Sequence, residues 1–191
     1  MLDIITQSLN ELKWNKTWTP YGRKSLNSAT EGEVEPERRC FITGLIRDWS
    51  IREHNNYTAS LRLSKPSKLI KHQMLMALAA MYIKEYDPSF AYTSIQFSKC
   101  VKTPKHRDRN NVGNSVIVAF GDYTGGGLII YDEDGGEHTH DIYHKPLVFN
   151  ANQYYHRTED FVGTRYTITV SYTHLRAHET PEHLVCRLLL E

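Results

Sequence analysis

The chain has 191 residues, a length typical of one domain, and 40% of them are hydrophobic, which is enough for an ordinary core. Its formal net charge of +1 excludes strong whole-molecule attraction to nucleic acid or membranes, so any basic surface has to be local. The three cysteines (Cys40, Cys100 and Cys186) lack CxxC spacing, and no apolar run approaches the roughly 20 residues that span a bilayer. We therefore expect a soluble intracellular protein, cytoplasmic or nuclear, without a disulfide framework.

The N-terminal third begins with a predicted short amphipathic helix, because apolar residues recur at intervals of three and four positions: Leu2, Ile5, Leu9 and Leu12. Trp14 and Trp18 are expected to pack against the core. The polar stretch 19–37, which contains prolines, glycines and four acids, is typical of a loop or lid.

A strand is predicted over 39–49, followed by a turn at Asn55-Asn56. The strongest helix signal begins at 64–67 and ends at Asp87-Pro88. Its methionines are expected to pack against a sheet, as flexible apolar side chains do in cores.

After Pro88 the sequence alternates in the manner of strands, with β-branched and aromatic residues between turn residues. The predicted strands are 92–97, 115–120, 127–131, 140–143, 147–149 and 165–172. We therefore predict an α+β, mainly β fold, a helix-supported antiparallel sandwich or jelly roll. The expected domain is 1–172, with helical support in about 1–88 and a β core in about 90–172.

Metal-ligand chemistry is concentrated in Lys105-His106-Arg107-Asp108. In extended chain, residues two apart project to the same side, so His106 and Asp108 can reach one ion. With the distant His156 they form a set of two histidines and a carboxylate that can occupy one face of a metal and leave the other open. Arg165 follows His156 by nine positions, and Thr167 points to the same side, so a guanidinium and a hydroxyl could hold a carboxylate there.

This pattern resembles the Fe(II)- and 2-oxoglutarate-dependent dioxygenases, whose fold is a double-stranded β-helix backed by helices. The resemblance implies that His106, Asp108 and His156 bind Fe(II). It also implies that 2-oxoglutarate chelates the iron while Arg165, assisted by Thr167, anchors its far carboxylate, and that O2 takes the last position. The ligand set alone would also accept manganese or cobalt.

A narrower resemblance, to the TET/JBP group of nucleic-acid base dioxygenases, rests on 106–115 and on the strand that leads to 121–126. Members of that group oxidise the methyl group of 5-methylcytosine or thymine. The resemblance covers about 92–172, and Arg-x-Thr at 165–167 departs mildly from the Arg-x-Ser of some members. It implies DNA as the substrate.

A basic cluster, Lys99, Lys102, Lys105, Arg107 and Arg109, surrounds the predicted ligands. It can neutralise phosphates, although a solvated basic loop is an equal alternative. The residues expected to contact a flipped base are Arg107, Asn110, Asn111, Tyr92, Tyr123 and Tyr155. Because the chain is small and has no zinc module, single-stranded or flexible DNA suits it best. No membrane or stable protein partner is implied.

Other histidines are set apart from this site. His138, His140 and His144 follow an acidic turn and are expected at the surface or in support of the metal ligands. The segment 173–191 resembles translated adapter sequence, so we exclude His174, His178, His183 and Cys186 from the site.

The leading hypothesis is a dioxygenase of the pyrimidine 5-methyl group in DNA, with 5-methylcytosine first and thymine next. One alternative is a protein side-chain hydroxylase of the prolyl type with the same iron site. Another is a non-catalytic jelly-roll binding module in which the same residues are structural.

Overall fold

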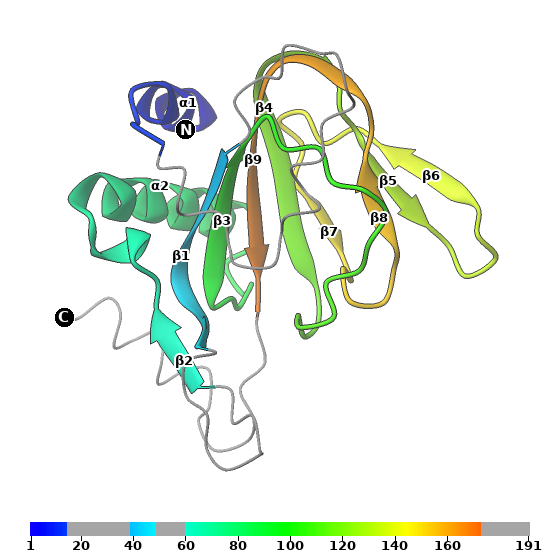
Figure 1. Cartoon of the computed structure of the whole chain (residues 1–191), viewed down its shortest axis with the longest axis horizontal. Helices are drawn as coiled ribbons and strands as arrows, with labels where there is room; N and C mark the ends of the chain where they lie inside the picture. The colour runs from blue at the N-terminus through cyan, green and yellow to red at the C-terminus, as the bar shows by residue number, and fades with distance from the viewer. Residues whose placement is uncertain (15–38, 49–59, 173–191) are drawn as a thin grey trace.

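Two antiparallel sheets form the centre of the molecule (Figure 1). The structure is a computed structural model that describes residues 1–14, 39–48 and 60–172. The larger sheet contains, in the order β2-β1-β3-β9-β4-β7, the strands β1 (Arg39–Asp48), β2 (Ser60–Leu63), β3 (Ser94–Lys99), β4 (Ser115–Gly125), β7 (Leu147–Phe149) and β9 (Phe161–Ser171). The smaller sheet contains, in the order β6-β5-β8, the strands β5 (Leu128–Tyr131), β6 (Glu137–His140) and β8 (His156–Thr158). The predicted mainly β jelly roll with supporting helices is confirmed.

The first helix, α1 (Leu2–Asn10), forms where the sequence predicts it. It buries Leu2, Ile5 and Leu9, which the three- and four-residue spacing places on one face. Just beyond its end, the Trp14 ring packs against Phe41 with centroids 5.2 Å apart. Trp18, the predicted lid at 19–37 and the turn at 55–56 lie outside the described residues.

The second helix, α2 (Ile70–Tyr86), follows the short 3-10 helix η3 (Pro66–Lys68). Its buried side is formed by His72, Leu75, Ala79 and Ile83. The expectation that its methionines pack in the core is wrong for Met74 and Met81, which are 61% and 58% exposed. A helix on the surface of a sheet buries one stripe only, and the composition of α2 did not indicate which stripe that would be. Among the described helices, none is long and apolar enough to cross a membrane.

Most predicted strands are present with shifted ends. The strand expected at 140–143 lies earlier, as β6, and the strand at 165–172 begins at Phe161. β8 was missed because its three residues, His156–Thr158, are too few to show alternation.

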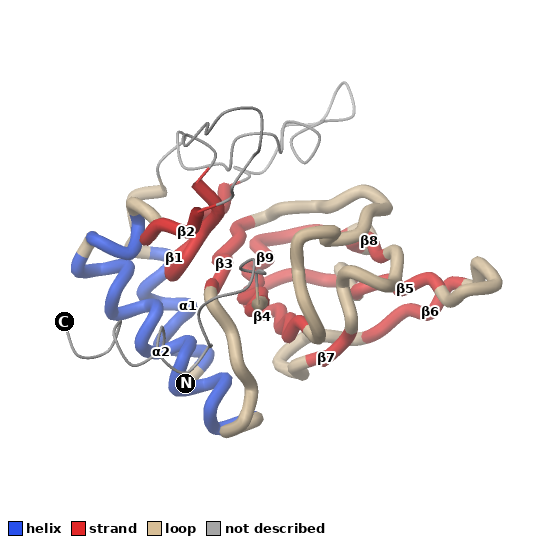
Figure 2. The backbone as a smooth tube through the Cα atoms, turned by 90° about the horizontal axis from the view of Figure 1, so that it is seen from below, coloured by secondary structure: helices blue, strands red, loops and turns tan. Residues whose placement is uncertain are grey.

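The two faces of the larger sheet differ in their neighbours. The helices and the smaller sheet lie on opposite sides of it (Figure 2). One cluster of buried side chains joins α1 and α2 to the outer face, including Phe97, Val118 and Ile168. A second, smaller cluster lies on the inner face, around Ala119, Leu128 and Ile142. Side chains alternate between the two faces along each strand.

Candidate metal centre

His106 and His156 face each other across a short antiparallel bridge. The amide of His106 donates to the carbonyl of His156 at 3.0 Å, and the amide of His156 donates to the carbonyl of His106 at 2.9 Å. Residues that exchange both hydrogen bonds in this way are direct cross-strand neighbours. Their imidazole centroids are therefore only 4.3 Å apart, although the residues are far apart in sequence.

Backbone carbonyls fix the orientation of both imidazoles. Nδ1 of His106 lies 2.7 Å from the carbonyl oxygen of Pro104, and Nδ1 of His156 lies 3.1 Å from that of Tyr154. Because a carbonyl only accepts a hydrogen bond, the neutral form of each imidazole carries its proton on Nδ1 and has its lone pair on Nε2. A lone pair on Nε2 is what a metal ligand requires.

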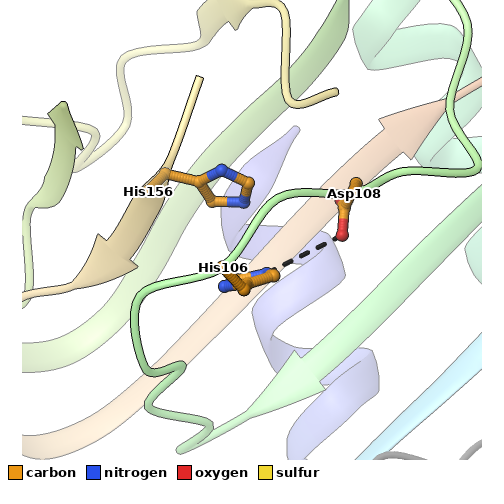
Figure 3. A group of neighbouring side chains, drawn as sticks. All are labelled: His106, Asp108 and His156. Carbon is orange, nitrogen blue, oxygen red and sulfur yellow. Dashed lines mark ion pairs between the residues drawn. The ribbon is translucent and has the colours of Figure 1, made fainter. Parts of the chain in front are cut away.

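Asp108 completes the set, as Figure 3 shows. Its Oδ1 lies 3.7 Å from Nε2 of His106, and the ligand atoms of His106, Asp108 and His156 all lie within 4.8 Å of one another. Among the described residues this is the one group of histidines, cysteines and acids with such geometry. The predicted triad is thus brought together, with two nitrogen ligands and one oxygen ligand.

The surroundings keep His156 neutral. Burial lowers the pKa of His156, and the neighbouring His106 lowers it further, against smaller opposing effects of the Tyr154 carbonyl and Asp108. The ring of Phe149 packs edge-on against it, with centroids 5.1 Å apart. A buried neutral imidazole beside a carboxylate is a suitable donor for a divalent transition metal.

Arg165 lies on the inner face of β9 and is only 3% exposed. Its Nε donates to the carbonyl of Gly126 at 3.1 Å, while its Nη2 is buried without a hydrogen-bond partner among the described residues. Burial lowers the pKa of the Arg165 guanidinium. A buried guanidinium with an unsatisfied donor is costly to fold and is stabilised by a carboxylate. Arg165 is therefore suited to bind an anionic group.

Tyr123 lies next to Arg165. Its ring centroid lies 5.6 Å from the Arg165 guanidinium carbon. Burial raises the pKa of the Tyr123 phenol, although Arg165 opposes the rise. The structure thus places Tyr123 beside the proposed carboxylate anchor, whereas the sequence suggested a contact to a base.

Gly126 permits this arrangement. A Cβ at Gly126 would lie 2.9 Å from both Cδ and Nε of Arg165, and its φ of +73° favours glycine. In the sequence, Gly125-Gly126-Gly127 indicates only a turn. Thr167, two residues after Arg165, is 6% exposed and lies on the same face of β9 by strand alternation.

Two cations of the basic cluster lie on aromatic rings. Nζ of Lys105 lies 3.4 Å from the centroid of the Tyr131 ring, and the guanidinium carbon of Arg107 lies 4.6 Å from that of Tyr155. Tyr131 was not predicted, because a strand tyrosine gives no local sign of such a contact. We call these four residues the basic-aromatic rim.

The other residues that the sequence predicts near the site have different surroundings from one another. Lys102 pairs with Asp160, Lys99 is half-buried in β3, and Arg109 is exposed. Asn110 is exposed, whereas Asn111 is buried. Tyr92 packs against the helix-side core, so the expectation that it contacts a base is not supported and we leave it out of the site.

His138 is a surface residue, as expected. Its Nε2 lies 2.9 Å from Oδ2 of Asp132, and the two side chains are 60% and 42% exposed.

The fold is similar to that of solved 2-oxoglutarate/Fe(II) oxygenases. An oxidoreductase of the 2OG-Fe(II) oxygenase family from Burkholderia pseudomallei matches with a TM-score of 0.58 and 11% identity over 91% of this chain and 78% of that chain. NgTET1 in complex with 5mC DNA matches with a TM-score of 0.50 and 13% identity over 78% and 68%. A Pseudomonas putida prolyl-4-hydroxylase matches with a TM-score of 0.39 and 17% identity over 72% and 70%.

No protein-family model and no curated protein sequence matches the chain. The solved structures nevertheless show that the chain has the fold of the 2-oxoglutarate/Fe(II) oxygenases. The resemblance predicted from the HxD motif is thus confirmed at the level of the fold.

Proposed function

We propose that this chain is an Fe(II)- and 2-oxoglutarate-dependent dioxygenase that oxidises the 5-methyl group of a pyrimidine in DNA, with 5-methylcytosine as the first candidate and thymine as the second. The observation that carries the proposal is the triad of His106, Asp108 and His156 on the same fold as a buried, incompletely paired Arg165. We assign the activity to one domain, 1–172.

The residues present fit the two groups. Nε2 of His106, Nε2 of His156 and Oδ1 of Asp108 would hold Fe(II), and Arg165 with Tyr123 and Thr167 would hold the far carboxylate of 2-oxoglutarate. When bound, iron and 2-oxoglutarate supply the activation of O2 needed to oxidise a C–H bond. The chain itself orients the histidines through the Pro104 and Tyr154 carbonyls.

A nucleic-acid substrate is supported by the basic-aromatic rim. Lys105 and Arg107 flank His106 in sequence, and their cationic groups lie over Tyr131 and Tyr155. Cations beside an exposed aromatic ring can bind phosphates while the ring stacks a base, and Tyr155 is 41% exposed, whereas the buried Tyr131 ring supports Lys105. Arg107 Nε is also buried without a hydrogen-bond partner among the described residues, which favours an anionic ligand. NgTET1, whose fold this chain shares, is solved with 5mC DNA.

The alternatives are weaker on the same observations. A prolyl-type hydroxylase could use the same iron site, but a neutral peptide side chain has no need of the basic-aromatic rim. A non-catalytic module would gain nothing from burying an Arg165 guanidinium whose Nη2 has no partner in the described ranges, because that arrangement costs stability.

The decisive experiment is mass spectrometry of nucleosides after 5-methylcytosine-containing DNA is incubated with the protein, Fe(II), ascorbate and 2-oxoglutarate. We expect oxidised 5-methylcytosine from the wild type and none from His156→Ala. Parallel single-stranded and duplex oligonucleotides of one sequence test the expected preference for flexible DNA.

Two further outcomes separate the alternatives. Oxidation of a proline-containing peptide but of no DNA would support the prolyl-type hydroxylase instead. Anaerobic addition of Fe(II) and 2-oxoglutarate should give a weak visible charge-transfer band, and its absence would support the non-catalytic module.

A further inference from the structure

Two asparagine side chains tie the loop that carries Asp108 to the rest of the site. Asn111 lies three residues after Asp108 and is 9% exposed, and Asn152 lies in the turn that precedes His156. The sequence predicts that Asn111 contacts the base, and it gives no sign of a role for Asn152 at the site.

The amide nitrogen of Asn111 has two acceptors for its two hydrogens. Nδ2 lies 3.3 Å from Oδ2 of Asp108 and 3.3 Å from Oγ of Ser115. Ser115 is fully buried at the start of β4, so it provides a fixed anchor. The contact with Ser115 orients the amide so that it donates to the carboxylate.

This bond distinguishes the two oxygens of Asp108. Oδ2 accepts from Asn111, whereas Oδ1 is the oxygen that lies 3.7 Å from Nε2 of His106. A carboxylate held through one oxygen presents the other oxygen in a fixed direction.

Asn152 fixes the backbone around this contact. Its Nδ2 donates to the carbonyl of Asn111 at 2.6 Å and to the carbonyl of Arg109 at 3.2 Å. The amide of Asp108 donates to the carbonyl of Ala151 at 2.8 Å, so the turn before His156 and the loop after His106 form one unit.

We propose that Asn111 is a positioning residue that makes Asp108 a one-oxygen metal ligand, and that Asn152 holds Asn111 in place. The inference rests on the proposed function only in that it requires a divalent metal at the triad. Asn111 acts through Asp108, and a leucine of similar size could fill its place without orienting the carboxylate.

The test is Mn(II) binding, followed by the loss of the electron paramagnetic resonance signal of the free ion, because this readout needs neither 2-oxoglutarate nor turnover. Asn111→Leu should weaken Mn(II) binding by about 10- to 100-fold, the usual effect of losing a group that orients a metal ligand. The matched control is Asn110→Leu at the exposed neighbouring position, which should bind as the wild type does. Thermal melting of each variant reports on folding.

Asn152→Ala removes the two carbonyl contacts without touching a ligand, and it should weaken Mn(II) binding by a smaller factor. If Asn111→Leu does not fold, the Mn(II) affinity of Asn152→Ala tests the positioning role instead.

The outcomes are distinct. Folded Asn111→Leu, or Asn152→Ala in its place, with wild-type Mn(II) affinity would overturn the positioning role and leave the proposed function intact. Equal weakening by Asn110→Leu would also overturn it, because the effect would then belong to the loop in general. A wild-type protein that binds neither Mn(II) nor Fe(II) would overturn the proposed function itself.

Discussion

The two faces of the larger sheet are built from the same strands but carry opposite chemistry. On β3 and β9, Phe97 faces Ile168 on the helix-covered face, whereas the next pair, Ser98 and Thr167, points to the inner face. All four residues are buried. The outer face is mainly apolar, with Thr43 and His72 as its buried polar residues, while the inner face carries hydroxyls and the guanidinium of Arg165.

This difference shows where stability and function lie. Buried apolar groups stabilise the fold, whereas a buried polar group costs free energy unless it is paired. The helix side therefore contributes most apolar stabilisation, whereas on the inner face Nη2 of Arg165 has no hydrogen-bond partner in the described part of the chain, which suits this face to bind a ligand. Substitutions on the two faces should consequently separate folding from binding.

The largest effect is expected from His156→Ala on the inner side. Removing one of the three proposed ligands should abolish Fe(II) binding and turnover, since the remaining two groups cannot hold the ion in place. The melting temperature without metal should change little, because His156 is not part of the helix-side core. Metal content after dialysis and succinate formation measure the first effect, and normal succinate formation by this variant would refute the iron assignment.

The next largest effect is expected from Phe97→Ala on the outer face. Phe97 is fully buried and stacks on Phe41 with centroids 4.9 Å apart. Its truncation should lower the free energy of unfolding by about 3–5 kcal/mol, as measured by urea denaturation. Ile95→Val is the milder control, with an expected loss of about 0.5–1.5 kcal/mol. If Phe97→Ala remains as stable as wild type but loses Mn(II) affinity, the division between the faces is incorrect.

A smaller effect is expected from Tyr123→Phe. It removes the hydroxyl beside Arg165, and one hydrogen bond of about 0.5–1.5 kcal/mol corresponds to a roughly 2- to 10-fold weaker affinity for 2-oxoglutarate. Calorimetric titration of 2-oxoglutarate into the Mn(II)-loaded protein measures it. Arg165→Ala should weaken the same affinity more strongly, because it removes a charged partner. If Tyr123→Phe leaves the 2-oxoglutarate affinity unchanged but weakens DNA binding, Tyr123 contacts the base, as the sequence predicts.

The smallest effect is expected on the pH dependence of the unfolding free energy, through His72 on the helix-covered side. His72 is 4% exposed and packs edge-on against Phe41, with ring centroids 4.6 Å apart. Burial lowers the pKa of His72 below the ordinary value of a histidine, 6.5. The unfolded chain therefore binds the proton more readily, so this contribution to stability is complete above about pH 6.5 and declines as the pH falls.

His72→Leu should flatten the decline of the unfolding free energy between about pH 7 and pH 5. Urea denaturation at several pH values measures it, and parallel curves for the variant and the wild type would show that His72 does not contribute.

Much of the architecture was predictable because its signals are local. The spacing of Leu2, Ile5 and Leu9 is enough for α1, and period-two alternation is enough for the central strands β4 and β9. α2 was found as an element, but Met74 and Met81 were placed on the wrong side, because a nearly uniform apolar sequence does not select a face.

For the site, the sequence alone determined the chemistry: two histidines and a carboxylate of the HxD pattern, followed by an arginine on a strand. Which polar side chains serve these groups was decided only by the tertiary structure. Asn110 and Asn111 are identical in type and adjacent, yet only Asn111 meets Asp108, because the turn at 150–153 holds the loop in one orientation. Likewise the Tyr123 ring lies 5.6 Å from the Arg165 guanidinium carbon, while Tyr92 packs against the helix-side core. The physical reason is that ligand type is a property of a residue, whereas a hydrogen-bond partner depends on segments that meet only when the sheets have formed.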